Sequence, residues 1–410
     1  MATVLLLSSV DTRKKEILFL KGLIEGQGCK VIIMDLSMAA YKEGVADHTC
    51  IEVARKAGVE FKDIAASKDT NKNMEIMVQG ATVIAKDLFQ KGVIDTIAGF
   101  GGVSNATTIS LIMKELPFGF PKLMLTTAAA IPAYAAKFFA ETDITMFHSC
   151  VDVNSLNDFV KSLLCRFAGM VAGVAKMEKV NLSGQTNSVA LTEFKFSEKC
   201  TKRIRGLLKK RGFEIVPFSA TGTSDRVMEQ MASKGLFKGI IDAVPAGLSE
   251  ALLGGNRSAG MDRLDKELQG EIPIIFTPCG FDMLSCGPYD RKDTDHFWKQ
   301  KRLAQRKLFV PDKFRVQART SRKEIAMVAQ AFAEKLNKAK GRVFVFIPLL
   351  GFSSLSKPGG PLFDPQTDKA FVTTFKNCIK EDKVEVIELN NTIDDPEFAD
   401  AIVEKFVQAL

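Results

Sequence analysis

Short apolar runs alternate with stretches of helical periodicity along most of the chain. This alternation is typical of a parallel β-sheet that carries helices on both faces. In the first half it predicts strands at Val4–Ser8, Lys30–Leu36, Val93–Gly99, Lys122–Thr127 and Ile144–Cys150. The helices predicted between and after these strands are Lys14–Gln27, Asn73–Gln90, Ala106–Glu115 and Ser155–Ala175. Residues 37–70 form a longer, more polar connection, which is typical of a functional lid at the edge of a sheet.

The periodicity breaks at residues 179–187, a stretch rich in turn-forming side chains, and a new alternation begins at Ser188. We therefore expect two domains, residues 1–182 and 186–410. The second half predicts strands at Ser188–Glu193, Glu214–Ser219, Gly239–Val244, Ile272–Pro278, Arg342–Pro348 and Val384–Leu389, and a last helix at Glu397–Leu410. The predicted fold is α/β, with two tandem doubly wound, Rossmann-like domains whose sheets are mainly parallel.

The composition is that of a folded chain with large cores, since 46% of the 410 residues are hydrophobic and 25% are charged. The N-terminal segment is apolar without a basic start, so we interpret it as a first strand and not as a signal peptide. No apolar run approaches the roughly 18–20 residues that a membrane span needs. The eight cysteines form no Cys-x-x-Cys pair and only three histidines are present, so we assign no metal ligands. These features predict a soluble, cytoplasmic protein without a membrane partner.

The net charge of +8 originates in the second half of the chain. Residues 181–410 hold 36 basic and 29 acidic side chains, whereas residues 1–180 hold 20 and 19. The segment Arg291–Lys323 alone holds 12 basic and 3 acidic residues, together with Phe297, Trp298, Phe309 and Phe314. Such a mixture can bind nucleic acid, but no RNA- or DNA-binding motif accompanies it. We therefore predict no nucleic-acid partner, and a basic excursion at about 289–320 that covers a cleft or forms an oligomer contact.

A glycine-rich turn joins the predicted strand Val93–Gly99 to the next helix, with the sequence Gly99-Phe100-Gly101-Gly102-Val103-Ser104-Asn105-Ala106-Thr107. Ligands of open parallel sheets lie at the carboxyl ends of strands, where glycines admit a phosphate and the free N–H groups of a helix start favour an anion. The turn is neither a Walker A loop nor a complete Gly-x-Gly-x-x-Gly. We predict an anion-binding loop with the candidates Gly101, Gly102, Ser104, Asn105 and Thr107. The alternative is a tight turn in which Ser104 or Asn105 caps the helix.

Other strand ends in the first half also carry polar side chains. Asp11 and Thr12 follow the first strand, where they either contact the ligand or cap the next helix. Thr127 follows the fourth strand and is a further ligand-binding candidate. His148 and Asp152 stand four residues apart near the end of the fifth strand, so they are candidates for a proton-transfer pair. The alternative is that His148 serves only as a hydrogen-bonding group.

The turns of the second half hold a similar mixture of glycine and charged residues. Arg257, Lys357, Gly359 and Gly360 are predicted to complete a polar ligand cleft facing the first domain. Asp282 is a third candidate for acid or base catalysis. The alternative is ordinary loop chemistry at the ends of strands.

The order and spacing of these motifs resemble a known family over nearly the full chain. The matching segments are Asp11-Thr12-Arg13, Gly101-Gly102 with Thr107, Pro121-Lys122-Leu123-Met124, Asp143-Ile144-Thr145-Met146, Val151-Asp152, Ala220-Thr221-Gly222, Gly254-Gly255, Ser258-Ala259-Gly260 with Asp262-Arg263-Leu264, Asp282-Met283, Pro358-Gly359-Gly360-Pro361 and Asp395-Pro396. They resemble the uncharacterised protein family that includes the amino-terminal ATP-binding domain of a tomato protein inhibiting tomato mosaic virus replication. The resemblance implies two α/β subdomains, ATP or a related nucleotide on the first, and a homodimer. Mg²⁺ can accompany such a nucleotide.

The glycine loop departs from the pattern of this family. The loop of the family usually continues Ser-Gly-Gly-Thr, whereas this chain has Val103-Ser104-Asn105-Ala106-Thr107, which removes backbone freedom where a phosphate would approach. The leading hypothesis is a nucleotide-binding protein. The first alternative is an enzyme of hydrolase or lyase type acting on a small anionic metabolite, with His148, Asp152 or Asp282 transferring protons. The second is a protein-interaction or inhibitor module.

Overall fold

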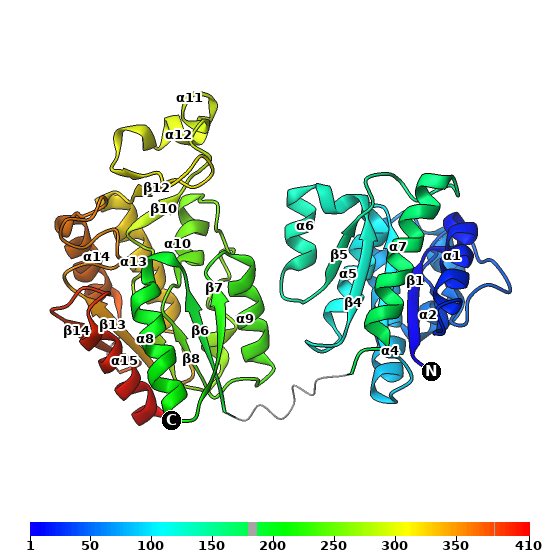
Figure 1. The fold of residues 1–410 in the computed structure, drawn as a ribbon, viewed down its shortest axis with the longest axis horizontal. Helices are drawn as coiled ribbons and strands as arrows, with labels where there is room; N and C mark the ends of the chain where they lie inside the picture. Colours follow the sequence, from blue (N-terminus) through cyan, green and yellow to red (C-terminus); the bar gives the residue numbers. More distant parts are fainter. Residues whose placement is uncertain (179–186, 381) are drawn as a thin grey trace. The chain divides into compact units, whose positions relative to one another are not determined.

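The computed structural model describes residues 1–178, 187–380 and 382–410, which belong to two compact units, Met1–Leu182 and Ser183–Leu410. Each unit contains a parallel sheet with helices on both faces (Figure 1). The α/β class with mainly parallel sheets is therefore confirmed. Among the described residues, no helix is both long enough and apolar enough to cross a membrane.

The sheet of the first unit has five parallel strands in the order β2-β1-β3-β4-β5. They are β1 (Thr3–Ser8), β2 (Lys30–Asp35), β3 (Thr96–Gly101), β4 (Lys122–Thr126) and β5 (Thr145–His148). The strand order reverses at β1, because β2 lies on one side of it and β3 on the other. The carboxyl ends of β1 and β3 are consequently neighbours that lead into different helices, and such a reversal is where open parallel sheets bind ligands.

The alternating side chains of β1 divide the core of the first unit into two layers. Val4 and Leu6 face α1 (Val10–Glu25) and α7 (Asp158–Ala175). On the opposite face, Leu5 and Leu7 pack with the remaining covering helices, α2 (Cys50–Lys56), α4 (Thr70–Gln90) and α5 (Val103–Lys114). Both layers exclude water, so burial of their apolar surface holds the strand ends in fixed positions.

Two sequence-based expectations for the first unit need correction. Residues 37–70 are not a plain polar lid, because they contain α2 and α3 (Phe61–Ala66), and Val53, Ala54 and Ile64 are buried. The helix predicted from Ala106 begins three residues earlier, at Val103. As a result Gly102 is the residue before the helix, and Val103–Asn105 form its first turn.

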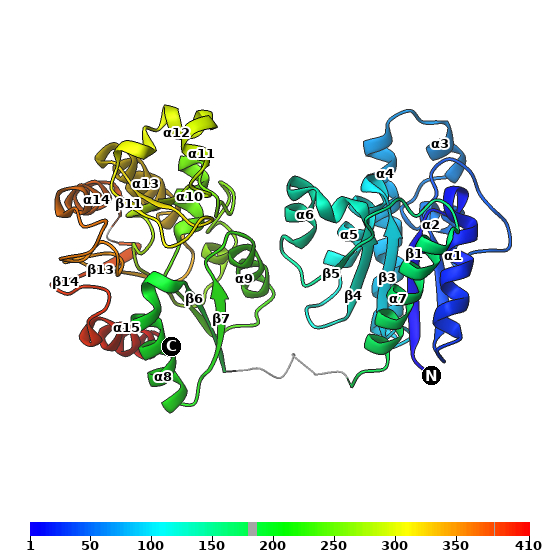
Figure 2. The ribbon, with the colours of Figure 1, turned by 45° about the horizontal axis from the view of Figure 1, so that its top comes forward.

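The sheet of the second unit has six parallel strands in the order β14-β13-β9-β8-β6-β7. They are β6 (Ser188–Glu193), β7 (Glu214–Ser219), β8 (Gly239–Asp242), β9 (Ile274–Phe276), β13 (Val343–Pro348) and β14 (Val384–Leu389). On one face lie α8 (Glu198–Lys210) and α15 (Pro396–Ala409). The other face carries α9 (Thr223–Ser233), α10 (Ala246–Leu253), α13 (Arg322–Leu336) and α14 (Pro365–Cys378), as Figure 2 shows from a second angle.

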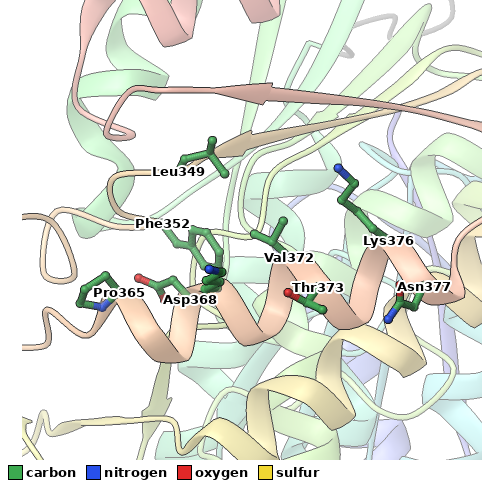
Figure 3. Close-up of a pocket in the computed structure, with 9 residues that line it drawn as sticks. Leu349, Phe352, Pro365, Asp368, Val372, Thr373, Lys376 and Asn377 are labelled. Atoms are coloured by element: carbon green, nitrogen blue, oxygen red, sulfur yellow. The ribbon is translucent and has the colours of Figure 1, made fainter.

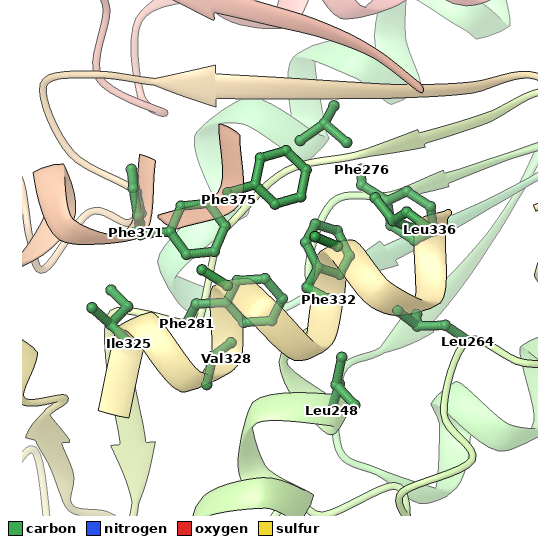
Figure 4. Packing of buried hydrophobic residues seen from close by; sticks show 14 of the residues in the cluster. Leu248, Leu264, Phe276, Phe281, Ile325, Val328, Phe332, Leu336, Phe371 and Phe375 are labelled. Carbon is green, nitrogen blue, oxygen red and sulfur yellow. The ribbon is translucent and has the colours of Figure 1, made fainter. Parts of the chain in front are cut away.

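Stacked and edge-on phenylalanine rings join α13 and α14 to the sheet. Phe332 packs edge-on against Phe276 and Phe281, with ring centres 5.5 and 5.2 Å away, and Phe371 stacks on Phe375 at 5.6 Å (Figure 4). Aromatic pairs in these geometries add to the free energy gained by burial alone. These contacts pack Phe276, the last residue of β9, against α13.

The basic excursion lies outside the six-stranded sheet, as predicted. It carries α11 (Arg291–Thr294) and α12 (His296–Gln300) and joins a small antiparallel sheet of β10 (Met283–Ser285), β12 (Gln317–Arg319) and β11 (Leu308–Phe309). Trp298 is buried and its indole N–H donates to the Cys286 carbonyl at 2.8 Å. Because its ring is enclosed by the protein, Trp298 is not available to stack on a base.

Candidate functional site

A hollow of about 320 Å³ lies at the strand reversal of the first unit. It is lined by residues that follow β1, β2 and β3: Ser9, Thr12, Arg13, Met38, Gly102, Val103, Ser104 and Asn105. Pockets of about 300 Å³ or more are large enough for small-molecule ligands. Two helices, α1 and α5, begin at this hollow, so the hydrogen bonds of their first turns determine which groups remain free for a ligand.

The start of α1 is held by side chains from the end of β2. Asp35 is fully buried, and its Oδ1 accepts hydrogen bonds from the Val10 N–H at 3.0 Å and from the Ser37 N–H at 2.9 Å. The Ser37 hydroxyl accepts from the Asp11 N–H at 2.9 Å. Because these groups satisfy the first turn of α1, the hydroxyl of Ser9, which precedes the helix, does not cap it.

The Ser9 hydroxyl instead reaches the other helix. It donates to Asn105 Oδ1 at 2.8 Å, which joins two residues 96 positions apart in the sequence. This bond orients the Asn105 amide group, whose Nδ2 is buried and finds no acceptor among the described residues. A buried donor without an acceptor is uncommon and costs free energy, so a ligand that accepts from Nδ2 would bind favourably.

The start of α5 is uncapped by any side chain. Gly102 precedes the helix, and the first intrahelical bond runs from the Ala106 N–H to the Gly102 carbonyl at 2.9 Å. The amides of Val103–Asn105 therefore have no acceptor within the helix, and they carry the positive end of its dipole. The alternative in which Ser104 or Asn105 caps the helix is wrong, since both lie inside its first turn.

Glycine at position 101 allows this turn to form. A Cβ placed on Gly101 would lie 2.5 Å from the Asn105 Cβ, closer than real Cβ contacts allow. Gly102 has an ordinary φ of −74°, and a Cβ there would come no nearer than 3.8 Å to Arg13 Nη2. Glycine is thus needed at position 101 because the chain packs closely there. Neither Gly101 nor Gly102 adopts a left-handed backbone conformation.

Arg13 brings a positive charge to the same hollow. Its backbone angles (φ −133°, ψ 28°) interrupt α1, and its Nη1 donates to Thr12 Oγ1 at 3.3 Å. Its Nε is buried without an acceptor, and no carboxylate among the described residues forms an ion pair with it. An arginine without a carboxylate partner beside free amides is suited to phosphate or carboxylate, which accept several hydrogen bonds at once.

The other first-half candidates lie around this hollow or apart from it. Thr12 lines it, whereas Asp11 does not, although Asp11 Oδ1 is buried and lacks a described donor. Thr107 is turned back into α5, since its hydroxyl donates to the Val103 carbonyl at 2.9 Å. Thr127 donates to Asp152 Oδ1 at 3.5 Å, at the ends of β4 and β5.

His148 and Asp152 do not form the expected pair. Both are exposed, and His148 Nδ1 lies 3.7 Å from Cys150 Sγ instead. Asp152 is engaged with Thr127, and no hydrogen bond joins the two candidates among the described residues. The geometry assigns no acid or base role to either side chain.

The corresponding reversal in the second unit, between β6 and β8, is filled by its own polar groups. The buried Thr192 hydroxyl donates to Asp242 Oδ1 at 2.5 Å and accepts from the Val244 N–H at 2.9 Å. Arg263, also buried, pairs with Asp242 at 2.5 Å. It also contacts three further carboxylates, those of Asp225, Glu229 and Glu267.

Burial raises the pKa of Asp225 to about 6 even though Arg263 opposes the shift. Burial also raises the pKa of Glu229 and of Glu267, while the four carboxylates hold the pKa of Arg263 well above its usual value. Arg263 Nε, Asp225 Oδ1 and Glu267 Oε2 are buried without a hydrogen bond from the described residues. Four carboxylates nevertheless surround the Arg263 charge, so the described part of this reversal offers no cation that lacks a carboxylate partner as Arg13 does.

The second-unit candidates are engaged with their own neighbours. Arg257 donates to Glu250 Oε1 at 2.9 Å and lies 4.9 Å from the Phe194 ring centre. Lys357 pairs with Asp394 at 2.7 Å. Asp282 is fully buried and accepts from the Ser353 hydroxyl at 2.6 Å.

Gly359 and Gly360 form a tight turn after β13. Gly359 has a φ of +81°, and a Cβ on Gly360 would meet the Leu355 carbonyl oxygen at 2.3 Å. These two glycines are therefore required by the turn itself. The polar cleft that these residues were predicted to form with the first domain stays a prediction.

Arg13, Ser9 and Met38 were not among the residues predicted for the site. Arg13 directly follows Asp11 and Thr12 in a segment that carries the family resemblance. It could therefore have been predicted as a site residue from the sequence. Ser9 and Met38 could not be found this way, because their relevance depends on contacts between distant parts of the chain.

Comparisons with known proteins cover both units. The model of the uncharacterised protein family UPF0261 N-terminal domain matches residues 2–180, and that of the C-terminal domain matches residues 186–410. A UPF0261 protein of Clostridium tetani is 29% identical over 407 residues, covering 99% of this chain and 98% of the relative. A UPF0261 protein of Brucella suis is 27% identical over 98% of this chain and 94% of its own length. The tomato mosaic virus resistance protein Tm-1(GCR237) of Solanum lycopersicum is 28% identical over 76% of this chain and 41% of its own length.

Proposed function

Because this chain belongs to the uncharacterised protein family UPF0261 across both of its units, we propose that its first unit binds the phosphate groups of a nucleotide, ATP or a close relative, at the ends of β1 and β3. The hollow at this strand reversal is the proposed site. Nucleotides bind at the equivalent place in many open parallel sheets, because glycine turns and helix starts meet there.

The observation that carries the proposal is the convergence of unpaired donors on one hollow. Arg13 Nε and Asn105 Nδ2 are both buried without an acceptor, and the uncapped start of α5 adds its free amides. A ligand made of acceptor oxygens with negative charge satisfies all of these groups at once, and a phosphate is such a ligand. A ligand without acceptor oxygens would leave these donors unsatisfied, and a neutral acceptor would leave the Arg13 charge without a counter-ion.

Asp11 does not line the hollow, although its Oδ1 is buried without a hydrogen bond from the described residues. None of the residues that line the hollow carries a carboxylate. Mg²⁺ is usually held by one or two carboxylates together with phosphate oxygens. We therefore assign no protein ligand to an Mg²⁺ ion that accompanies the nucleotide.

Asn105→Asp provides a sharp test of this site. The substitution keeps an oxygen for Ser9 and replaces the orphan donor with a second, negatively charged acceptor. Isothermal titration calorimetry of the full chain with ATP, ADP and inorganic phosphate should show binding to the original protein. The variant should bind at least about tenfold more weakly, since 1.4 kcal/mol corresponds to a factor of ten.

Asn157→Asp is the matched control. Asn157 caps α7 through its side-chain oxygen, at 3.0 Å from the Val160 N–H, and aspartate is an equally good cap. This variant adds the same charge to the same unit and should bind ATP as the original does. Failure of the original protein to bind any of the three ligands, or equal affinities for all variants, would rule out the proposal.

A further inference from the structure

A second, larger hollow lies along α14 in the second unit and is separate from the site proposed above. Its volume is about 530 Å³, and it opens between this helix and the segment that follows β13. The residues that line it come from both sides of the groove: Leu349, Phe352, Pro365, Asp368, Lys369, Val372, Thr373, Lys376 and Asn377. Figure 3 shows these side chains arranged along the α14 helix beneath Leu349.

Most of the wall of this groove is apolar. Leu349 is 39% exposed, unusual for a leucine next to a core, whereas Phe352 is fully buried and packs edge-on against Phe371 at 5.4 Å. Val372 completes the apolar part on the helix side. Apolar ligand atoms that cover this surface would gain free energy by removing it from water.

One buried acid interrupts the apolar wall. Asp368 is only 4% exposed, and its Oδ1 accepts from Arg319 Nη2 at 2.5 Å. Its other oxygen, Oδ2, receives no hydrogen bond from any described residue, although Asp368 lines the groove. A carboxylate oxygen without a protein donor, on a residue that lines a groove, is well placed to accept a hydrogen bond from a ligand.

The charges behind the groove are not balanced. Arg319 is the cation nearest to Asp368, but it also lies 4.0 Å from Asp282 Oδ2. Its Nε and Nη1 are buried and make no hydrogen bond with the described residues. Its single positive charge faces two carboxylates, those of Asp282 and Asp368. With both acids ionised the cluster carries one net negative charge, and a buried net charge is unfavourable unless a counter-ion joins it.

We propose that this groove binds a small ammonium compound with an apolar body, with the ammonium on Asp368 and the apolar body on Leu349 and Val372. The ammonium supplies the missing positive charge and a donor for Oδ2, and the body covers the exposed apolar wall. Lys376 at the far end is paired with Glu388 at 2.9 Å, so a local carboxylate offsets its charge. Lys369 is exposed at the rim, where solvent screens it.

Binding should depend on pH in a defined direction. Burial raises the pKa of Asp368 to about 7, against the opposing effect of Arg319, and Asp282 and Asp364 add to the shift. Because the ammonium binds the ionised form, protonation of Asp368 competes with the ligand. Affinity should therefore rise by about tenfold or more between pH 5.5 and pH 8.

The test compares 2-phenylethylamine with 3-phenylpropionate by calorimetry on the full chain. The two compounds share an apolar body and differ in the charge of the head group. We expect the amine to bind and the carboxylate not to bind. Equal binding of both, or binding of the carboxylate alone through Lys369, would overturn the proposal.

Variants locate the binding. Asp368→Asn retains an oxygen for Arg319 but loses the charge, and it should weaken amine binding at least tenfold and abolish the pH dependence. Val372→Trp should block the groove while leaving the acidic cluster intact, which keeps the test valid if the first variant does not fold. Asp293→Asn is the matched control, because it removes the same charge from an exposed side chain that does not line the groove, and it should bind the amine as the original does. Unchanged amine affinity in both Asp368→Asn and Val372→Trp would refute the site.

Discussion

Replacing Arg13 by alanine should weaken phosphate binding strongly and change stability very little. In the structure the Arg13 side chain makes one hydrogen bond with the described residues, to Thr12 Oγ1 at 3.3 Å, and its buried Nε is unsatisfied. A hydrogen bond from a charged donor contributes about 1.5–3 kcal/mol, so Arg13→Ala should reduce ATP affinity by roughly 10- to 150-fold. The same substitution removes an unsatisfied buried donor, so the free energy of unfolding should change by less than about 0.5 kcal/mol.

Calorimetric titration with ATP and urea unfolding of the same preparations measure the two effects. Lys14→Ala is the matched control, because Lys14 is the adjacent cation, is exposed and does not line the hollow. It should bind ATP within about twofold of the original, as expected for a screened surface charge. The reasoning is refuted if Arg13→Ala binds ATP as tightly as Lys14→Ala does, or if it unfolds much more readily than the control.

Three further substitutions test the packing around the two sheets. Gly101→Ala should clash with Asn105, so we expect it to lower the free energy of unfolding by about 1–3 kcal/mol and to weaken ATP binding. Gly206→Ala is the control, because a Cβ at Gly206 meets nothing within 4 Å, and it should not destabilise the chain in urea unfolding. Arg263→Met leaves four buried carboxylates without their cation. It should lower the free energy of unfolding by about 3–5 kcal/mol at pH 7, and by less at pH 5, where the acids take up protons. An equal loss of stability at both pH values would contradict this prediction. Hydrogen bonds from Arg306, Ser321 and Lys301 outweigh burial and lower the pKa of Glu324 to about 2, so its contribution is present above pH 4.5 and lost as the pH falls toward 2. Glu324→Gln should therefore be about 2 kcal/mol less stable at pH 7, with a difference that narrows in acid unfolding curves below pH 4.

The alternation of apolar runs predicted every parallel strand among the described residues, because strands buried on both faces are recognisable without tertiary information. β6, β7 and β14 have the predicted bounds, and other strand ends differ by one to three residues. β10, β11 and β12 were not predicted, since strands of two or three residues leave no periodic signal. β10 pairs with β12 through residues that are far apart in the sequence, such as Met283 and Arg319, whereas β11 and β12 are close together along the chain.

The glycine loop does line the hollow of the first unit, but the sequence alone does not show which of its side-chain groups remain free for a ligand. Whether Asn105 caps a helix or presents a free amide depends on Ser9, which lies 96 residues away. From the sequence, Arg257 and Lys357 were also predicted to bind the ligand, just as the first-unit candidates were. Their carboxylate partners, Glu250 and Asp394, are visible only after folding.

A crystal structure of the chain grown with ATP and Mg²⁺ would test the central claim most directly. The account predicts phosphate oxygens in the hollow at the ends of β1 and β3, about 3 Å from Arg13 Nε, Asn105 Nδ2 and the first amides of α5. Nucleotide density at another place, such as the Gly359-Gly360 turn of the second unit, would contradict it. So would a bound nucleotide whose phosphates leave Arg13 and Asn105 without a contact.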